Sequence, residues 1–419
     1  MPTTNLFVLL LLLCGNVRAS VAEFDWSTWN SKQPPAVAQD TIQSEFGVSL
    51  NGESIGSGLI NQAFQGKYGK AKTSVAVKIA KDPAKFRDRI HSEIRFILYA
   101  RHKLEIDEAN RHFVRLYHIL QWDGSALHVV PIEEIEASND RAAYFSGIVG
   151  TVWEFCPYGT AKQLTSHLVY RPGTTYPPIP RKIISGPITL KDTFPWALQL
   201  LESVARMHKM DFAHRDIKGS NALVCSSDNG NEVRLKLGDF DTCRERKYAI
   251  GMQRDSKNYG TPAYNPVEFC GILVDNNVPF DVLLSNDWYT TGTLVLQLIL
   301  PFKSLQSEMA QMEHHMATAV ERPSRRIHEC LRAKETKGAI VSTLKQYSRH
   351  EMWLRGWDRN FVLPLGNPLE TKVGMLALLF VQVYNNDPAS RPTPRGLLDT
   401  LTPLSNKLVD VPEDQCCVM

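Results

Sequence analysis

One eight-residue segment, HRDIKGSN at 214–221, constrains the fold of this chain more than any other part of the sequence. Apolar residues flank it on both sides, with Phe212 and Ala213 before it and 222–224 (ALV) after it. A polar run between apolar segments predicts a loop held between two buried strands. Such a loop is either a solvated turn or a site that holds a hydroxyl, a proton acceptor and a metal ion together.

Other segments carry residues that suit phosphate chemistry. The segment LKLGDFDT at 235–242 offers Asp239, and the first segment offers Asn221. Carboxylate and amide oxygens are the ligands that Mg²⁺ takes when it bridges phosphate groups. Upstream, ESIGSGLINQAF at 53–64 contains two glycines, Gly56 and Gly58, between predicted strands. Glycines allow backbone N–H groups to approach phosphate oxygens, although most such pairs are ordinary hairpin turns.

A lysine strengthens the phosphate hypothesis. Lys78 lies inside the apolar strand SVAVKIA at 74–80. A strand lysine usually protects an exposed sheet edge. A buried ammonium group instead needs an anion, and Glu93 on the next predicted helix supplies one. Together with the glycines, this pair predicts a phosphate-binding site.

The order of predicted elements indicates an α+β fold with two lobes. Alternating, β-branched residues predict strands within 47–80, and further strands fit 113–121, 126–132 and 148–155. Apolar residues at helical spacing predict a helix at 84–103. Helices dominate later, at 195–209, 286–300 and 370–384. A small β-rich lobe therefore precedes a larger helical lobe, with the junction near 155–160.

These motifs together resemble those of the eukaryotic protein kinases of the Ser/Thr type, over roughly residues 45–405. HRDIKGSN matches the catalytic loop, LKLGDFDT the metal-binding loop, WEFCPYGT (153–160) the hinge and GTPAYNPVE (260–268) the substrate-docking turn. The resemblance implies transfer of the γ-phosphoryl group of ATP to Ser or Thr of a protein substrate. The implied cofactors are ATP and Mg²⁺, for which Mn²⁺ can substitute. The implied fold has an N-lobe at about 45–155, a C-lobe at about 156–405, and insertions at about 171–190 and 303–360.

The resemblance also assigns roles by matching position. Asp216 should accept the proton of the attacking hydroxyl, and Lys218 should neutralise charge on the transferred group. Asn221 and Asp239 should hold Mg²⁺. Contacts with ATP are implied for Ile55, Gly56, Ser57, Gly58, Ala63, Lys78, Glu93, Glu154 and Cys156.

Further positions match structural and regulatory residues of the family. Asp287 should tether the catalytic loop, and Arg391 should pair with Glu268. Arg215 is the expected clamp for a phosphate group on the activation segment, with Ser256 preferred to Thr261 as the acceptor. The complete set with implied structural or regulatory roles is His214, Arg215, Ser256, Thr261, Glu268, Asp287 and Arg391.

Three positions depart from the family pattern. Asn61 replaces the third glycine of the phosphate loop, but Asn tolerates positive φ, so the loop should still turn. Asp241 replaces the glycine of Asp-Phe-Gly, which removes backbone freedom and would either tighten metal binding or misplace Asp239. Trp153 occupies the gatekeeper position and should nearly close any pocket behind adenine. A nucleotide-binding pseudokinase with a scaffold role is therefore the alternative to an active kinase.

Composition bears on partners and compartment. A net charge of +3 over 419 residues gives no broad basic surface, so nucleic acid is not an expected partner. Residues 1–19 combine an apolar run with small residues before Ser20, which predicts a cleaved signal peptide and a secreted or secretory-pathway protein; 20–44 would be an N-terminal extension. The eight cysteines lack metal-ligand spacing and the density of a disulfide scaffold, which is typical of a reducing compartment.

The C-terminal tail at 406–419 carries a conflicting signal. Its last four residues, CCVM, fit a prenylation box at Cys416 and hence contact with a membrane. Prenylation takes place in the cytosol, whereas a signal peptide directs a chain away from it. Three histories remain open: a secretory-pathway kinase, a kinase on the cytosolic face of a membrane, and a kinase secreted by one cell that acts in the cytosol of another.

Overall fold

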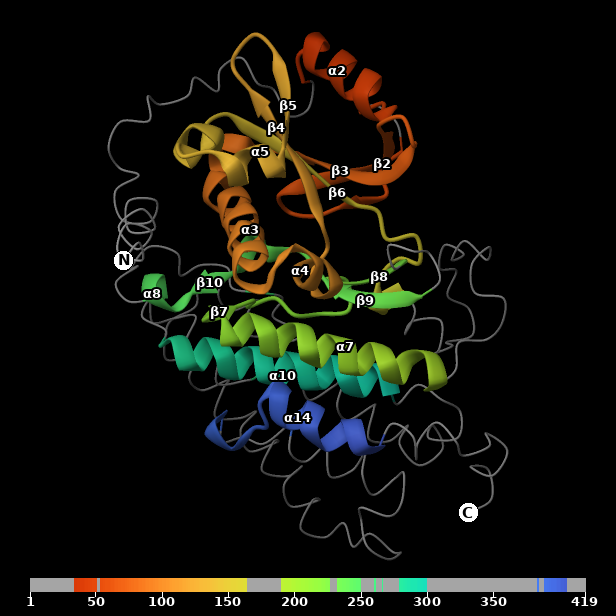
Figure 1. Ribbon diagram of the computed structural model, residues 1–419, viewed down its shortest axis with the longest axis vertical. Helices are drawn as coiled ribbons and strands as arrows, with labels where there is room; N and C mark the ends of the chain where they lie inside the picture. Colours follow the sequence, from red (N-terminus) through yellow and green to blue (C-terminus); the bar gives the residue numbers. More distant parts are fainter. Residues whose placement is uncertain are drawn as a thin grey trace, which may run out of the picture. The chain divides into compact units, whose positions relative to one another are not determined.

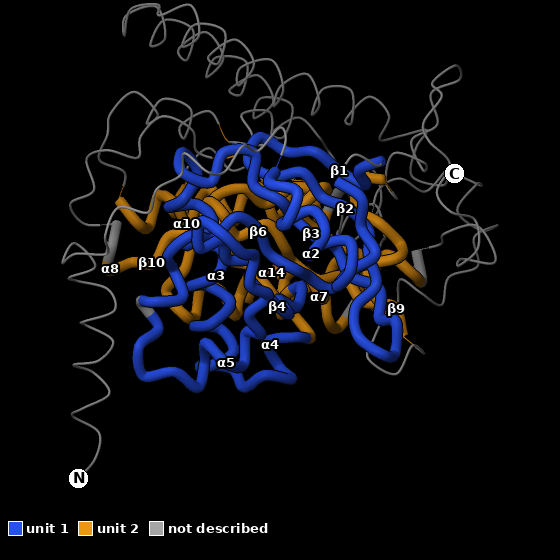
Figure 2. Tube along the Cα trace, turned by 90° about the horizontal axis from the view of Figure 1, so that it is seen from above, with its two compact units in different colours: residues 1–110, 114–155 blue, residues 111–113, 156–419 orange. Residues whose placement is uncertain are grey.

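The computed structural model divides the chain into two compact units (Figure 2). Unit 1 contains residues 1–110 and 114–155, and unit 2 contains 111–113 and 156–419. None of the described helices is long and apolar enough to cross a membrane. The structure describes residues 34–50, 53–163, 190–226, 232–249, 260, 266, 279–299, 383 and 388–404.

Unit 1 is built on a six-stranded antiparallel sheet with strand order β1-β2-β3-β6-β4-β5 (Figure 1). Residues on β3 mostly alternate between buried and partly buried, whereas β6 is buried along almost its whole length. The strands predicted near 74–80, 113–121, 126–132 and 148–155 are all present. Their bounds are β1 Gly56–Ser57, β2 Asn61–Tyr68, β3 Thr73–Ala80, β4 Leu116–Trp122, β5 Leu127–Pro131 and β6 Ile148–Glu154.

The helix predicted at 84–103 is α3, Pro83–Leu104. It begins where Asp82 caps it, because the Asp82 carboxylate accepts a hydrogen bond from the Lys85 N–H group and Pro83 suits the first turn. Its apolar face buries Ile90, Ile94 and Phe96. The unit also contains α5 (Ile132–Ala137) and the 3-10 helix η2 (Arg141–Phe145), and α4 (Ile106–His112) follows α3.

One helix of unit 1 was not predicted from the sequence. α2, Ala36–Phe46, falls mostly within the segment 20–44 that was expected to be an extension. Its fully buried residues Ala38, Ile42 and Phe46 recur every four positions and join the core formed by the inner faces of β2 to β6. The folded unit therefore begins before residue 45, and the spacing of these three residues was the available signal.

Unit 2 is mainly helical. α7 (Leu190–Lys209), α10 (Phe280–Ile299) and α14 (Pro394–Leu401) pack on one another (Figure 1). α7 begins five residues before the predicted start at 195, and α10 covers most of the predicted 286–300. Two short sheets carry the loops of interest: β8 (Ala222–Ser226) pairs with β9 (Val233–Leu237), and β7 (Phe212–Ala213) pairs with β10 (Arg244–Glu245). The remaining elements are η3 Phe240–Thr242, α8 Arg246–Ala249, η5 Pro388–Ser390 and η6 Thr402–Leu404.

Several predictions fall on residues that the structure does not describe. These are the signal peptide, the tail with Cys416, nearly all of the insertion at 171–190, the whole insertion at 303–360, most of the helix at 370–384, and the residues Ser256, Thr261 and Glu268.

A disulfide bond joins Cys156 to Cys225 within unit 2. This differs from the interpretation of the cysteines as thiols of a reducing compartment. The two residues are 69 positions apart, and only the fold brings them together, so their spacing in the sequence gave no indication. Among the described residues, Cys243 is buried and is not part of a disulfide bond.

Candidate active site

Unit 1 contains the predicted ion pair. The Lys78 ammonium on β3 lies 2.8 Å from a carboxylate oxygen of Glu93 on α3. Glu93 is only 2% exposed, whereas the Lys78 side chain is 21% exposed. A carboxylate this buried needs a partner, because an unpaired buried charge is strongly destabilising. The pairing fixes α3 against β3 and leaves one side of the ammonium group accessible.

Trp153 is the second partner of Lys78. The Lys78 ammonium lies 4.9 Å from the centre of the Trp153 ring, and the Trp153 indole N–H donates to Thr151 Oγ1 at 2.7 Å. Lys78 stands directly opposite Thr151 in the sheet, so Lys78, Thr151 and Trp153 share one face. The Trp153 side chain is buried, and its role behind adenine stays a prediction. The cation–π contact was not predicted from the sequence, although the alternation of residues along a strand contained the signal.

The position of α3, and so of Glu93, depends on a second anchor. Arg101, near the end of α3, is 5% exposed. It donates two hydrogen bonds to Glu136 (2.6 and 2.9 Å) and one to Glu133 (3.0 Å), both on α5. Burial lowers the pKa of Arg101, but the hydrogen bonds and charges of the two glutamates outweigh it and raise the pKa. The guanidinium therefore stays charged and holds α3 at the end opposite to its capped start.

The glycine-rich segment forms a tight hairpin between β1 and β2. The Ile55 N–H group donates to Ala63 O, and the Gly58 N–H group donates to Asn61 O, both at 2.9 Å. Lys81 reinforces the turn through a hydrogen bond to Ser57 Oγ at 2.8 Å. Asn61 begins β2 and does not have positive φ, so the conformational tolerance expected of it is not needed. An Asn at this position is compatible with the hairpin for a simpler reason: the backbone there is extended.

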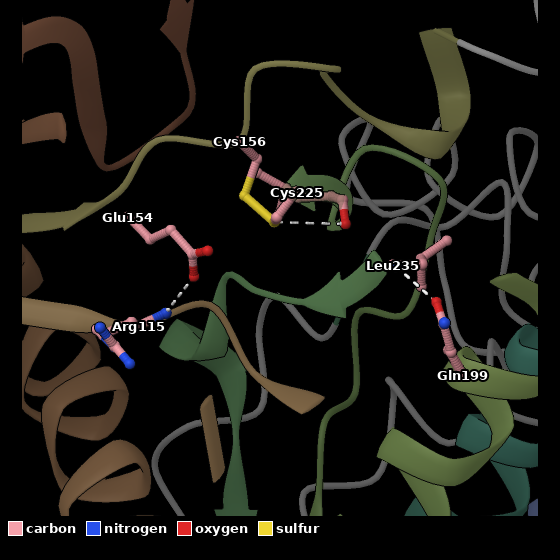
Figure 3. The surroundings of a disulfide bond; sticks show 7 residues. Arg115, Glu154, Cys156, Gln199, Cys225 and Leu235 are labelled. Carbon is pink, nitrogen blue, oxygen red and sulfur yellow. Dashed lines mark hydrogen bonds between the residues drawn. A yellow bond between two sulfur atoms is a disulfide. The ribbon is translucent and has the colours of Figure 1, made fainter. Parts of the chain in front are cut away.

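Glu154, at the end of β6, is tied to Arg115 by two hydrogen bonds, of which Figure 3 draws the one to the Glu154 carboxylate. Its N–H group donates to Arg115 O at 2.8 Å, and its carboxylate accepts from the Arg115 N–H group at 3.2 Å. Arg115 directly precedes β4, so the end of β6 is fixed by main-chain contacts. Cys156, two residues later, belongs to unit 2.

In unit 2, HRDIKGSN is the connection between β7 and β8, as predicted. Asp287 on α10 is fully buried and accepts hydrogen bonds from the N–H groups of His214 (2.6 Å) and Arg215 (2.8 Å). It also lies 3.0 Å from His208 Nε2. Asp287 therefore tethers the loop from below, which is the role that the resemblance implied. Arg215 adopts φ of 72°, a costly conformation for a non-glycine residue, and these hydrogen bonds hold it there.

His214 connects this loop to the following one. The ring is fully buried; Nε2 lies 3.1 Å from Gly238 O, and Nδ1 accepts from the Asp216 N–H group at 3.3 Å. A carbonyl can only accept, so the ring proton is on Nε2. Thr242 Oγ1 donates to His214 O at 2.8 Å. The two polar loops are thus joined through one histidine.

Asp216 and Lys218 lie at the centre of the loop. The Lys218 ammonium is 2.6 Å from Asp216 Oδ2, and both side chains are partly exposed. Asn221 donates from Nδ2 to Asp216 O at 2.8 Å and to Asp216 Oδ2 at 3.2 Å. These bonds orient the Asn221 amide so that Oδ1 is on the opposite side, where Ser220 Oγ contacts it at 3.3 Å. An amide oxygen held in this way is a suitable donor for a hard cation.

Asp239 follows β9 in a left-handed conformation with φ of 65°. Phe240 turns inward, is fully buried, and contacts the rings of Phe113 (5.6 Å) and His214 (5.5 Å). The Gly238 N–H group donates to Asn221 O at 2.8 Å, so the two candidate metal ligands lie just beyond the same end of the paired strands β8 and β9. Asn221 and Asp239 are both oxygen donors, so they fit the Mg²⁺ that the resemblance implies.

The structure answers one concern about Asp241. Asp241 lies within η3 and is not among the residues with positive φ. A glycine at this position would supply conformational freedom that the backbone does not use. The unusual residue is therefore compatible with the observed backbone around Asp239.

Arg391 is buried, lies over the Tyr289 ring at 5.0 Å, and donates to Ser285 Oγ at 3.4 Å. Its expected partner, Glu268, is outside the described residues.

Comparison with known proteins gives a consistent picture. A family model described as the protein kinase domain matches residues 153–400. The chain is 27% identical over 128 residues to Rho-associated protein kinase let-502 of Caenorhabditis briggsae, covering 29% of this chain and 10% of that protein. It is 26% identical over 145 residues to serine/threonine-protein kinase ksp1 of Schizosaccharomyces pombe, covering 34% and 27%. It is 40% identical over 125 residues to a probable serine/threonine-protein kinase of Dictyostelium discoideum, covering 29% and 7%.

These matches span between 7% and 27% of the length of the three relatives. The family model, in contrast, covers more than half of this chain, and it begins at the end of β6. Unit 1, which lies almost entirely before that match, has the β-sheet lobe that the family fold requires. The chain therefore belongs to the eukaryotic-like Ser/Thr protein kinase family.

Proposed function

We propose that this protein is an active kinase that transfers the γ-phosphoryl group of ATP to Ser or Thr hydroxyls of a protein substrate. The observation that carries the proposal is the loop 214–221, in which Asp216 is paired with Lys218 and the backbone is fixed by Asp287. Phosphoryl transfer depends mainly on positioning and on neutralising charge, and this loop supplies both.

Each residue has a defined task in this proposal. Asp216 accepts the proton of the substrate hydroxyl, and Lys218 balances charge on the transferred group. Lys78, held by Glu93, binds phosphate oxygens in unit 1. Asn221 and Asp239 would hold Mg²⁺, which supplies neutralisation of phosphate charge when it is bound. Glu154 and Cys156 present their backbone groups to adenine.

The alternative of a nucleotide-binding pseudokinase depends on Asp241. The η3 backbone at Asp241 needs no glycine, and the residues with predicted catalytic tasks are all present. No other described feature favours a scaffold role, so we prefer the active kinase.

The substitution Asp216→Asn tests this preference. We expect wild-type protein with MgATP to phosphorylate Ser- and Thr-containing peptides, and Asp216→Asn to lower kcat by about 10²- to 10⁴-fold without loss of nucleotide binding. Asp399→Asn, on the exposed side of α14, is the matched control and should keep wild-type kcat. Nucleotide binding by the wild type with no transfer to any Ser, Thr or Tyr peptide would favour the pseudokinase.

Regulation by phosphorylation is a further part of the proposal. Arg215 is 3% exposed, and its backbone is fixed by Asp287. We propose that it receives a phosphate group on Ser256, because a guanidinium binds phosphate through two parallel hydrogen bonds. Ser256→Ala should then keep the low kcat of the unphosphorylated protein after treatment with an activating kinase. Equal kcat for phosphorylated, unphosphorylated and Ser256→Ala protein would contradict this role.

The compartment is also a proposal. The signal at 1–19 and the Cys156–Cys225 disulfide both support a secretory-pathway or secreted protein, because disulfides persist in oxidising environments. Prenylation at Cys416, with contact to a cytosolic membrane face, is the competing proposal. Intact-mass analysis of the native protein separates them. Loss of residues 1–19 supports export, and a farnesylated Cys416 without the last three residues supports the membrane anchor.

A further inference from the structure

The Cys156–Cys225 disulfide belongs to a series of connections between the same two segments of unit 2. Residues 156–162 run antiparallel to residues 219–225. The Lys162 N–H group donates to Gly219 O at 2.9 Å, Thr160 forms a β-bridge with Leu223, and the Val224 N–H group donates to Gly159 O at 2.8 Å. The disulfide is the last connection in this series and lies at the end that carries Cys156 (Figure 3).

The two segments connect residues with different tasks in the proposed function. Cys156 stands at a position whose backbone meets adenine in that proposal. Cys225 lies on β8, four residues after Asn221, one of the two candidate metal ligands. The disulfide therefore ties the adenine-contacting backbone to the strand that follows the catalytic loop. The other connections lie toward the catalytic loop, so they fix the position of Cys156 less directly.

The two cysteines differ in exposure, and this difference indicates which sulfur a thiolate would attack. Cys225 is fully buried, whereas Cys156 is 6% exposed. Both residues are buried, and Cys156 is the less buried of the two, so Cys156 Sγ is the sulfur that a small thiolate would attack, with the Cys225 thiolate as the leaving group. A second thiolate then attacks the sulfur of the mixed disulfide and releases Cys156 as a thiolate. Overall, two small-molecule thiols become one disulfide, the protein disulfide becomes two cysteines, and the two protons lost by the thiols pass to the cysteines.

We propose that Cys156 and Cys225 form a redox modification site that a small-molecule thiol–disulfide couple controls, and that its state sets the affinity for nucleotide. This inference rests on the proposed nucleotide site of unit 2. Two thiol sulfurs cannot remain at bonding distance, so reduction removes the covalent restraint on Cys156, whose backbone is then held by the hydrogen bond from the Gly159 N–H group to Cys156 O at 3.2 Å. In this proposal the disulfide form is the one that binds nucleotide tightly, because it adds a covalent restraint to the Cys156 backbone.

The experiment uses the full chain equilibrated in glutathione buffers of defined thiol-to-disulfide ratio. Alkylation of free thiols followed by peptide mapping measures the fraction of the Cys156–Cys225 linkage. Calorimetry on the same samples measures the affinity for MgADP. We expect the linkage to form and break reversibly, and the Kd for MgADP to rise by about tenfold on reduction, because a pre-organised site is lost.

Two variants isolate the disulfide. Cys225→Ser should show the weak affinity of the reduced protein in every buffer, because it cannot form the bond. Cys243→Ala replaces a buried cysteine outside the pair and should keep the redox response of the wild type. If Cys225→Ser does not fold, the redox titration of the wild type still decides the question.

Three results would overturn the inference. The first is the absence of a Cys156–Cys225 linkage in every buffer, and the second is equal MgADP affinity at full oxidation and full reduction. Either leaves the proposed kinase function intact. The third is no MgADP binding in either state, with the linkage formed normally, which refutes the nucleotide site of the proposed function as well.

Discussion

The two units hold their candidate catalytic charges in different ways. In unit 1, the Lys78 ammonium group contacts two side chains, the Glu93 carboxylate and the Trp153 ring. In unit 2, Asp216 lies in a loop whose backbone is held by Asp287 and His214. A side-chain pair on two elements can separate if α3 moves, whereas a loop bound by main-chain hydrogen bonds to a buried residue cannot move without exposing those groups.

The difference shows where this kinase can tolerate motion. A buried N–H group without an acceptor costs about 1–3 kcal/mol, so the loop of unit 2 has a strong preference for one conformation. The Lys78–Glu93 pair has Lys78 partly exposed, so water can replace Glu93 at the ammonium group if the pair opens. We therefore expect the loop 214–221 of unit 2 to stay fixed and the Lys78–Glu93 pair of unit 1 to be the more adjustable of the two arrangements.

The largest expected effect is on the fixed loop. Asp287→Asn replaces a carboxylate that accepts from two N–H groups with an amide that presents its own N–H group to one of them. The loss should reduce the stability of unit 2 by about 4 kcal/mol. Hydrogen exchange of the His214 and Arg215 amides measures it directly. Asp281→Asn, an exposed position on the same helix, is the control and should leave both amides protected.

The next effect tests the adjustable pair. Lys78→Met removes the phosphate contact and leaves Glu93 buried without its cation, so kcat/KM for ATP should fall by about 100-fold or more, equivalent to about 3 kcal/mol. Lys70→Met, an exposed residue of the turn between β2 and β3, should retain wild-type kcat/KM. Protection of the His214 and Arg215 amides should not change. A simultaneous loss of that protection would show that the two units are not independent in the way we infer.

A buried histidine gives unit 2 a pH dependence. Burial, together with the charges of Arg206, Arg234 and Arg111, lowers the pKa of His112 from 6.5 to about 4. Arg206 Nε donates to His112 Nε2 at 2.7 Å, which requires the neutral ring and places its proton on Nδ1, near Ser203 Oγ.

The direction of the change in stability with pH follows from the difference in His112 pKa between the folded and the unfolded protein. The unfolded chain takes up a proton near pH 6.5, whereas the folded protein does so only near pH 4, so stability is greatest above pH 6.5 and decreases as pH falls toward 4. At pH 5 the loss should be about 2 kcal/mol. Denaturant unfolding of His112→Gln should show a shallower decrease, and His102→Gln, exposed on α3, should follow the wild type. Identical pH profiles for all three proteins would contradict the assignment.

The smallest effect concerns Trp153. Trp153→Leu removes the ring beside the Lys78 ammonium, and a cation–π contact of this kind contributes about 1 kcal/mol, so the KM for ATP should rise about fivefold. Trp153→Phe keeps an aromatic ring that attracts a cation less strongly, so its KM for ATP should lie between those of the wild type and Trp153→Leu. In a double-mutant cycle that combines Trp153→Leu with Lys78→Met, the effects of the two substitutions on the KM for ATP should be non-additive. Additive effects would mean that Trp153 acts only by filling space.

Much of this architecture could be predicted from the sequence because the relevant contacts follow regular patterns. Strands β3 to β6 and helix α3 follow from apolar periodicity, and the Lys78–Glu93 pair follows from a lysine placed in an apolar strand. The position of HRDIKGSN between β7 and β8 follows from its apolar flanks. The roles of Asp216, Lys218, Asn221 and Asp239 remain predictions that the geometry supports.

Other features depend on contacts that no local pattern encodes. The disulfide joins residues 69 positions apart, and the Arg101 anchor joins α3 to α5. Whether Asp241 is compatible with the backbone around Asp239 could not be predicted from the sequence, because it depends on the φ angle of Asp241. Helix α2 was missed for a different reason: its three core residues are spaced regularly, but Ala38 is small and the remaining residues are mixed, so its apolar stripe is narrow.

The strand order of unit 1 also has a consequence for synthesis. β6 lies between β3 and β4, so both of those strands keep an unpaired edge until residues 148–154 have left the ribosome. At about 5–20 residues per second, some 70 residues of delay after β3 leave that edge unpaired for several seconds. An open edge is a template for association with another chain. Slow codons or substitutions that delay β6 should therefore promote aggregation of the nascent chain more than equivalent changes in β1, which pairs only with β2.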